Sequence, residues 1–173
     1  MKILLIIDML KGFCLKGHPL SLPDSTKEIE KEIKARIKAY QNNENKYFFI
    51  CDSHSKNDPE INNPYPPHCM KGTAEVEIID SLVKYANMEN TITKNTLSIT
   101  YKTKLIEKLE ELRPTEIEIT GVCTDICVLF AVYELRIRGY NVTVNSKGVL
   151  PLKSDNQKFF LNYMSELLSA EIK

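Results

Sequence analysis

The sequence predicts an α/β fold in which a mostly parallel sheet of five or six strands is covered by helices on both faces. Two observations support this prediction. Short runs rich in β-branched and aromatic residues alternate with amphipathic stretches, and the first two strand-like runs are continuously apolar at 3–7 and 48–51. Such continuous apolar strands are typical of parallel sheets that are buried on both sides. A chain of 173 residues that is 43% hydrophobic fits one globular domain, residues 1–173.

The predicted strands and helices follow one another in alternation. Strands are expected at 2–8, 46–52, 91–93, 116–122 and 141–144. Helices are expected at about 25–41, 74–87, 103–112, 125–138 and 154–169. Gly139 is a suitable stop for the fourth helix. The start signals are two capping boxes, Ser25 with Glu28 and Ser154 with Gln157, and two N-caps, Thr73 and Thr103.

Charge and hydropathy argue against several classes of partner. Lys and Arg together number 23, as do Asp and Glu, so the net charge favours neither nucleic acid nor an anionic membrane. The N-terminal apolar run is short, ends at Asp8 and lacks a small-residue cleavage site, so it is interpreted as a buried strand. No stretch approaches the roughly 20 apolar residues that span a bilayer. We therefore expect a cytoplasmic protein with a small-molecule substrate.

Four reactive side chains are expected at one edge of the sheet. Asp8 ends the first predicted strand, Asp52 ends the second, Lys94 follows the third, and Cys127 lies just past the fourth. In folds of this kind, ligand sites form beyond the C-terminal ends of the strands. Each residue alone has an ordinary structural interpretation, because Asp is common where strands end. The coincidence of all four favours a catalytic site.

Two cysteines stand at the junction of the fourth strand and its helix. Cys127 lies two residues into a helix expected to begin near Asp125, where free N–H groups and the helix dipole favour a thiolate nucleophile. Cys123 precedes the helix, where its backbone N–H is suited to bind an oxyanion. The alternative is that both are small buried hydrophobes. The odd total of five cysteines, without framework spacing, predicts reduced thiols.

A second group of residues has the composition of a metal site. If the strand geometry continues through His54, this residue and Asp52 lie on the same side of the chain. Together with His68, from the irregular segment 53–72, they form a candidate set of ligands. Carboxylate and imidazole ligands with open positions suit a catalytic or substrate-binding Zn, Mn or Fe ion.

A structural zinc site is the alternative for the same region. Its ligands would be Cys51, His54, His68 and Cys69. The adjacent residues His68 and Cys69 are poorly placed to bind one ion together, and the spacing is not that of a standard zinc finger. The remaining histidine, His18, has no evident partner and is expected at the surface.

Four motifs occur in an order that is typical of one enzyme family. They are an early strand ending in IIDM with Phe13 five residues after its Asp, DSH with a later PPHCMKGT, the lysine of TKNTLS, and GVCTDICV at 121–128. Together they resemble the isochorismatase-like cysteine hydrolases, and among these the metal-containing nicotinamidases. The resemblance covers nearly the whole chain. The pattern GV-x-TD-x-CV is a strong signal of the family, and D-x-H with PPHC points to nicotinamidases.

The resemblance implies a three-layer α/β/α fold, the isochorismatase-like hydrolase fold, with Asp8, Lys94 and Cys127 as catalytic triad. Asp8 is expected to take the proton from Cys127, whose thiolate attacks the amide carbonyl to form a thioester while Asp8 protonates the departing ammonia. Lys94 is expected to hold Asp8 and the thiolate electrostatically. The family also implies a cis peptide at Val122–Cys123 and an oxyanion hole made by the N–H groups of Cys123 and Cys127.

The resemblance further implies one divalent metal ion, with zinc preferred and Mn or Fe as alternatives. The expected ligands are Asp52, His54 and His68, with Glu60 as a further ligand, directly or through water. In metal-containing relatives the ion binds the pyridine nitrogen of nicotinamide and orients its carboxamide. The residues expected to contact the substrate are Phe13, Tyr65 and Val122.

The sequence departs from the family pattern around the expected pocket. It reads DMLKGF where many relatives read DMQ-x-DF, and Tyr65 stands where a Trp often precedes the histidine motif. Leu97 and Thr100 replace aromatic residues that often follow the lysine.

The predicted function is that of a nicotinamidase, which converts nicotinamide to nicotinate and ammonia in NAD salvage. The alternatives are a related small-amide or isochorismatase-type hydrolase, a non-catalytic protein that binds a small molecule or a metal, and a redox sensor using Cys123 and Cys127. By analogy with relatives, a homo-oligomer is also expected.

Overall fold

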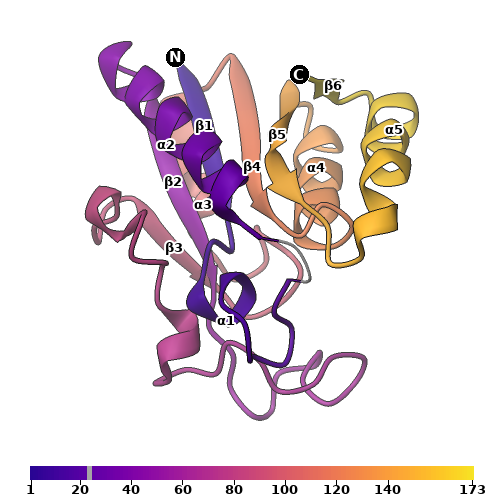
Figure 1. Ribbon diagram of the computed structural model, residues 1–173. Helices are drawn as coiled ribbons and strands as arrows, with labels where there is room; N and C mark the ends of the chain where they lie inside the picture. The colour runs from indigo at the N-terminus through magenta and orange to yellow at the C-terminus, as the bar shows by residue number, and fades with distance from the viewer. Residues whose placement is uncertain (23–24) are drawn as a thin grey trace.

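Six parallel strands form the central sheet of the computed structural model, which describes residues 1–22 and 25–173 (Figure 1). The order across the sheet is β3-β2-β1-β4-β5-β6. The strands are β1 (Lys2–Ile7), β2 (Lys46–Asp52), β3 (Thr91–Lys94), β4 (Glu116–Val122), β5 (Val142–Leu150) and β6 (Glu171–Ile172). The prediction of a parallel sheet of five or six strands is confirmed.

Helices cover both faces of this sheet. One face carries α1 (Lys11–Cys14) and α2 (Lys27–Asn42), and the other carries α3 (Leu105–Leu112), α4 (Cys127–Arg136) and α5 (Gln157–Leu168) (Figure 1). Along β1, Leu4 packs into the core under α2, whereas Leu5 packs into the core under the other helices. The strand is apolar throughout because both of its faces are buried, and the three-layer prediction is confirmed. No helix of the described residues is long and apolar enough to cross a membrane.

The predicted α-helix at 74–87 is wrong. The segment forms two short 3₁₀ turns, η1 (Ala74–Val76) and η2 (Val83–Tyr85), joined by more extended backbone. This backbone is used for long-range hydrogen bonds with the residues that follow β1. The N–H of Lys11 donates to the carbonyl of Glu77 at 2.8 Å, and the N–H of Ile79 donates to the carbonyl of Met9 at 3.1 Å. Tertiary pairing therefore outweighs the local helical pattern.

Several helices begin two or three residues later than predicted. Thr26, not Ser25, is the N-cap residue of α2, and Lys104, not Thr103, is that of α3. Ser154 begins a 3₁₀ turn, η3 (Ser154–Asn156), that leads into α5. Thr73 does act as a cap, since its hydroxyl accepts the N–H of Glu75, but it caps the turn η1. Local sequence patterns do not determine the exact first residue of a helix, because that residue also depends on how the helix packs against the sheet.

The last two strands differ most from the prediction. β5 continues to Leu150 through the polar sequence NSKG, which carries no strand signal. Its pairing with β4 shifts register between Ile119 and Gly121, and this irregularity keeps the two strands paired to their ends. β6 was not predicted, because two residues are too few for a recognisable period.

The C-terminal ends of the strands carry the predicted reactive residues. From β1 the chain continues to β2 on one side of the sheet, and from β4 it continues to β5 on the other side. Because the connections diverge at this point, a crevice is expected beyond the C-terminal ends of β1 and β4. In Figure 1, helix α1 and the loop that follows β2 lie at this end of the sheet. The N–H of His54 donates to the carbonyl of Cys69 at 2.9 Å, so both ends of that loop are held beside β2.

Candidate active site

Asp8, Lys94 and Cys127 are brought together at the ends of three strands. Asp8 follows β1, Lys94 is the last residue of β3, and Cys127 is the first residue of the helix after β4. The Lys94 Nζ atom lies 2.9 Å from Asp8 Oδ2 and 3.8 Å from Cys127 Sγ. A carboxylate oxygen of Asp8 lies within 4.8 Å of the Cys127 sulfur. All three residues are buried, with exposed fractions of 1%, 3% and 5%.

Two unusual backbone positions permit this approach. Asp8 has a φ of 51°, in the left-handed region that Asp and Asn enter more readily than most residues. Gly121 has a φ of 107°, and a Cβ atom there would lie 2.0 Å from the carbonyl oxygen of Ile7. Only glycine fits so close to a neighbouring backbone. The end of β4 therefore lies directly against the end of β1, with the turn to α4 beside Asp8.

Lys94 also forms an ion pair with Asp52, so one buried ammonium lies between two buried carboxylates. Burial opposes its charge, but Asp52 and Asp8 outweigh burial and raise the pKa of Lys94 well above its usual value. Burial acts to raise the pKa of Asp52, yet Lys94 and His54 lower it below its usual range. Burial, and next the charge of Asp52, raise the pKa of Asp8 to about 6 against the effect of Lys94. Of these two carboxylates, Asp8 is thus the one suited to exchange a proton near neutral pH.

Cys127 is a thiol in this arrangement. Burial raises the pKa of its side chain well above the usual value, and the opposing effect of Lys94 is smaller. The expectation of a thiolate at this helix start is therefore corrected, because burial raises the pKa of Cys127 more than the charge of Lys94 lowers it. A buried thiol needs a base before it can attack, and Asp8 is the carboxylate within reach.

The turn between β4 and α4 presents two unused amide groups. The peptide bond Val122–Cys123 is cis, as the resemblance implies. The carbonyl of Cys123 accepts the N–H groups of Ile126 and Val128 at 3.0 and 3.1 Å. Within the part of the chain that the structure describes, no such backbone hydrogen bond is found from the N–H of Cys123 or Cys127. Both amides are available as donors to a negatively charged oxygen beside the sulfur.

Asp52, His54 and His68 form a compact group of buried side chains. One ligand atom of each lies within 4.8 Å of the others. The Nε2 atoms of His54 and His68 lie 3.5 and 3.9 Å from Asp52 Oδ2. Cys51 and Cys69, the other ligands of the alternative zinc site, do not join this group, and burial raises the pKa of both thiols.

The free donor atoms of this group fit a divalent ion. His54 is fully buried, and neither of its ring nitrogens has a hydrogen-bond partner among the described residues. The Nδ1 atom of His68 lies 2.8 Å from the carbonyl oxygen of Pro66. A carbonyl only accepts, so Nδ1 carries the proton and Nε2 keeps its lone pair, which lies toward Asp52. Unpaired imidazole nitrogens beside a carboxylate are the donors that Zn, Mn and Fe ions accept.

Glu60 and His18 have partners that the sequence did not predict. Glu60 does not belong to the group of direct ligand atoms, and its Oε1 accepts the N–H of Leu97 at 2.6 Å. It holds the chain that follows Lys94. A contact of Glu60 with the ion through water stays a prediction. His18 has a partner after all, since its Nδ1 lies 3.0 Å from a carboxylate oxygen of Glu75. That contact joins the loop after α1 to η1, and a distant carboxylate of this kind cannot be recognised from sequence spacing.

A narrow cavity leads to Cys127. Its volume is about 20 Å³, close to the space of one water molecule, so a ring-sized substrate must displace lining side chains. Phe13 and Tyr65 line it as predicted, and their rings lie 5.8 and 5.9 Å from the ring of His68. Val122 does not line it, because its side chain is fully buried in the core under α2. The lining residues that the sequence did not suggest are Leu20, Ile126 and Leu152.

Asp125, the acidic residue of the GVCTDICV motif, holds one wall of this cavity. Its two oxygens accept the N–H of Leu152 at 2.8 Å, the N–H of Lys153 at 3.3 Å and the side-chain amide of Asn156 at 2.8 Å. Asp125 thus positions the segment after β5 across from Cys127. The prediction that the helix begins near Asp125 overlooked this role, since the partners lie far along the chain.

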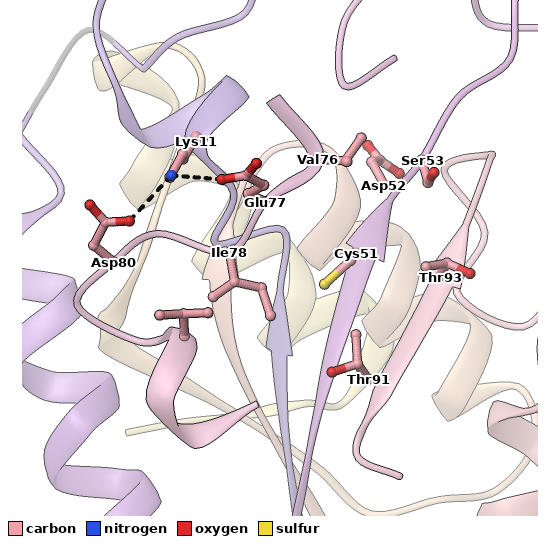
Figure 2. A pocket seen from close by; sticks show the side chains of 11 residues that line it. Lys11, Cys51, Asp52, Ser53, Val76, Glu77, Ile78, Asp80, Thr91 and Thr93 are labelled. Atoms are coloured by element: carbon pink, nitrogen blue, oxygen red, sulfur yellow. Dashed lines mark hydrogen bonds and ion pairs between the residues drawn. The ribbon is translucent and has the colours of Figure 1, made fainter. Parts of the chain in front are cut away.

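A second, larger cavity, of about 360 Å³, shares Asp52 with the first as a lining residue (Figure 2). It is bordered by the edge of β2 and β3 and by the segment that follows η1, with Cys51 and Thr93 among its lining residues. The ammonium of Lys11 at its rim is already paired with Glu77 and Asp80, at 2.7 and 3.2 Å. Neither Asp8 nor Cys127 lines it. The smaller cavity is therefore the candidate active site.

Comparisons with known proteins match nearly the whole chain. A family model described as the isochorismatase domain matches residues 2–172. Nicotinamidase 1 of Arabidopsis thaliana is 30% identical over 154 residues, which cover 80% of this chain and 62% of the plant protein. The pyrazinamidase/nicotinamidase of Streptococcus mutans has a TM-score of 0.91 at 28% identity over the full length of both chains. The nicotinamidase of Bacillus subtilis has a TM-score of 0.90 at 26% identity, covering 99% of this chain and 98% of that one.

The family match extends over the sheet, its helices and the candidate active site. The matched residues include every strand of the sheet and both groups of buried polar side chains. The family resemblance inferred from the four motifs is therefore confirmed. This protein belongs to the isochorismatase family of hydrolases.

Proposed function

We propose that this protein is a cysteine amidohydrolase that converts nicotinamide to nicotinate and ammonia. The observation that carries the proposal is the buried contact of Cys127 with Lys94 and Asp8 at the base of a narrow cavity. The nicotinamidases among the similar proteins support the choice of substrate. A cytoplasmic location and a role in NAD salvage belong to the same proposal.

The first half of the reaction begins with Asp8 as an ionised carboxylate. Asp8 takes the proton of the Cys127 thiol, and the thiolate attacks the amide carbonyl carbon of the substrate. The carbonyl oxygen gains the negative charge and accepts hydrogen bonds from the N–H groups of Cys123 and Cys127. Asp8 then protonates the amide nitrogen, the C–N bond breaks, and ammonia leaves behind a thioester on Cys127.

The second half releases the acid. Asp8, again a carboxylate, takes a proton from a water molecule whose oxygen attacks the thioester carbonyl. The C–S bond breaks, the sulfur recovers the proton from Asp8, and the carboxylic acid departs. Lys94 stays protonated throughout, because two carboxylates raise its pKa, and its positive charge stabilises the thiolate.

Asp52, His54 and His68 are the residues that would hold a divalent ion. A bound ion would act as a Lewis acid toward a ring nitrogen of the substrate and would thereby help to orient the amide. Phe13 and Tyr65 line the same side of the cavity and are suited to contact an aromatic ring. The chemical steps themselves use Asp8, Cys127 and backbone amides.

The proposal is tested by ammonia release from nicotinamide, with benzamide and a short set of aliphatic amides as comparison substrates. Benzamide has the same shape as nicotinamide but lacks the ring nitrogen. We expect turnover of nicotinamide and much slower turnover of benzamide. Activity on aliphatic amides alone would discard nicotinamide as the substrate but keep the thiol chemistry, whereas no turnover of any amide by the metal-loaded protein would refute the function.

Replacement of His54 by Ala is expected to abolish stoichiometric metal binding, because it removes one of the three ligands. The metal content is measured by elemental analysis after dialysis against zinc, and the folded state is followed by circular dichroism. His18→Ala is the matched control, since His18 pairs with Glu75 and should leave the metal content unchanged. An unchanged metal content in His54→Ala would place the ion elsewhere.

The rate of hydrolysis is expected to fall as the pH drops through about 6. Asp8 acts as a base only when ionised, and its pKa is raised to about 6, mainly by burial. Below that value, kcat/KM should decrease about tenfold per pH unit, since one proton is taken up. The measurement is a pH profile from 4.5 to 8 with the metal held at saturation. A profile that stays flat to pH 4.5 in a folded enzyme would show that Asp8 is not the base.

The redox-sensor alternative is weakened by the state of the thiols. All five cysteines are free, and burial raises the pKa of Cys123 and Cys127 well above the usual value. Oxidation by peroxide proceeds through the thiolate, which neither residue favours at rest. A sensor also has no need of the buried Lys94 and Asp8.

A further inference from the structure

One wall of the candidate active site comes from the segment between β3 and α3. This segment, residues 95–101, directly follows Lys94, and its residue Leu97 lines the cavity. The side chain of Leu97 is partly buried and packs against the core under α3, α4 and α5. Ile99, two residues further, is fully buried in the same core. The position of this wall therefore depends on what holds the segment in place.

Glu134 of α4 holds this segment with three hydrogen bonds. Its Oε1 accepts the hydroxyl of Ser98 at 2.5 Å, and its Oε2 accepts the N–H groups of Ile99 and Thr100 at 3.0 and 3.2 Å. Hydrogen bonds to a charged acceptor are stronger than those between neutral groups. The carboxylate of Glu134 thus fixes the backbone immediately after Leu97.

Helical spacing explains how Glu134 reaches this segment from the helix of the nucleophile. Glu134 follows Cys127 by seven residues on α4, which is nearly two turns of a helix. Both side chains therefore leave the helix on the same side, about 10 Å apart along its axis. One face of α4 carries the reactive sulfur and, further along, the carboxylate that holds a wall beside it.

Other carboxylates hold the walls of the same cavity in a similar way. The Oε1 of Glu60 accepts the N–H of Leu97, so the backbone is held at Leu97 and again directly after it. Asp125, just before α4, accepts the N–H of Leu152, which also lines the cavity. The cavity has a volume of only about 20 Å³, so its width depends on residues whose backbone is anchored by carboxylates.

We propose that Glu134 determines which substrates fit this site, because it keeps Leu97 in place as one wall of the cavity. The inference rests on the proposed amidase function and narrows its substrates to amides of small unsubstituted rings. Glu134 is not among the lining residues, so it is a positioning residue that acts through Leu97. A held wall resists displacement by an extra substituent, and one methylene group more or less in an apolar pocket changes kcat/KM about 10- to 200-fold.

The proposal is tested by comparing kcat/KM for nicotinamide with kcat/KM for a nicotinamide that carries a methyl group on a ring carbon. Glu134→Ala is expected to lower the preference for nicotinamide at least about fivefold, because the wall at Leu97 is loosened. Leu97→Ala should lower it in the same direction. In the double variant the two effects should not add, since both substitutions act on the same wall.

Two further variants show that the effect belongs to the hydrogen bonds of Glu134. Glu134→Gln keeps one acceptor oxygen, so its preference for nicotinamide should lie between those of Glu134→Ala and the wild type. Glu110→Ala removes an exposed carboxylate of α3 and is the matched control, which should keep the preference of the wild type.

A purely structural role of Glu134 would give a different result. General destabilisation lowers kcat/KM for both amides alike and leaves their ratio unchanged. An unchanged ratio in folded Glu134→Ala, or fully additive effects in the double variant, would overturn the proposal. If circular dichroism shows that Glu134→Ala does not fold, Ser98→Ala takes its place. It removes one of the three hydrogen bonds, and an unchanged ratio in that variant would overturn the proposal equally.

Alkylation of Cys127 separates this inference from the proposed function. Iodoacetamide is a small reagent and N-phenylmaleimide a bulky one, and peptide mass spectrometry follows the labelling of Cys127 by each. Glu134→Ala is expected to raise the rate with N-phenylmaleimide relative to iodoacetamide at least about fivefold. The same ratio of rates in the variant and the wild type would contradict the role of Glu134. A shifted ratio in a protein that hydrolyses no amide would refute the proposed function and leave that role standing.

Discussion

Replacement of Cys127 by Ala is expected to abolish amide hydrolysis and to leave the fold intact. The sulfur is the only nucleophile in contact with both Lys94 and Asp8 among the described residues, and the loss of an essential nucleophile lowers kcat by at least about 10⁴-fold. The substitution removes one atom from a buried position, so the free energy of unfolding should change by only about 1–2 kcal/mol. Ammonia release and urea unfolding measure the two effects separately.

The matched control is Cys14→Ala. Cys14 is a partly buried thiol that packs against the core under α2. We expect this variant to retain most of its activity, which separates loss of one particular thiol from loss of any thiol. Retention of more than a tenth of the activity by Cys127→Ala would rule out the proposed mechanism. Trapping a thioester by acid quench in the wild type, and not in the variant, would support it directly.

Replacement of Lys94 by Met is expected to be strongly destabilising as well as inactivating. Met keeps much of the side-chain volume but leaves Asp8 and Asp52 as buried carboxylates without their common partner. Removal of one member of a buried ion pair costs about 3–5 kcal/mol, mainly because the remaining charge stays unpaired. Urea unfolding of the metal-free protein at pH 7.5 measures this loss.

Two further variants show whether the loss comes from the unpaired carboxylates. Lys104→Met removes an exposed lysine and should change the free energy of unfolding by less than about 0.5 kcal/mol. Addition of Asp8→Asn to Lys94→Met should recover part of the stability, because one buried charge is removed. If Lys94→Met were as stable as the wild type, the two buried ion pairs of Lys94 with Asp8 and Asp52 would not contribute to stability as proposed.

Local pattern was sufficient for the central strands and for the identity of the reactive residues. The bounds of β2 and β4 match the prediction because both runs are rich in β-branched or aromatic residues, although β4 also contains Glu116 and Glu118. Asp8, Asp52, Lys94 and Cys127 could be placed at one edge because strands in a parallel sheet all end on the same side. The family motifs then suggested roles for them.

Long-range contacts account for what the pattern missed. The segment 74–87 has an amphipathic pattern, but its amide groups bond to residues after β1, and no local signal reveals such partners. The sequence predicts Glu60 near the metal ligands but not that its carboxylate also accepts the N–H of Leu97 in the chain after Lys94. The sequence predicts a helix start near Asp125, whereas its carboxylate accepts hydrogen bonds from three groups in the segment after β5.

The chain thus carries in its sequence the layered α/β architecture, the family and the residues able to do chemistry, because periodicity, composition and motifs are local properties. The protonation state of Cys127 and the raised pKa of Asp8 arise from burial, which depends on how distant segments pack. The same holds for the apolar residues that stay exposed on α5, such as Phe159 and Leu167. The amphipathic spacing of a helix is local, but which of its apolar residues remain uncovered follows from the sheet and helices around it.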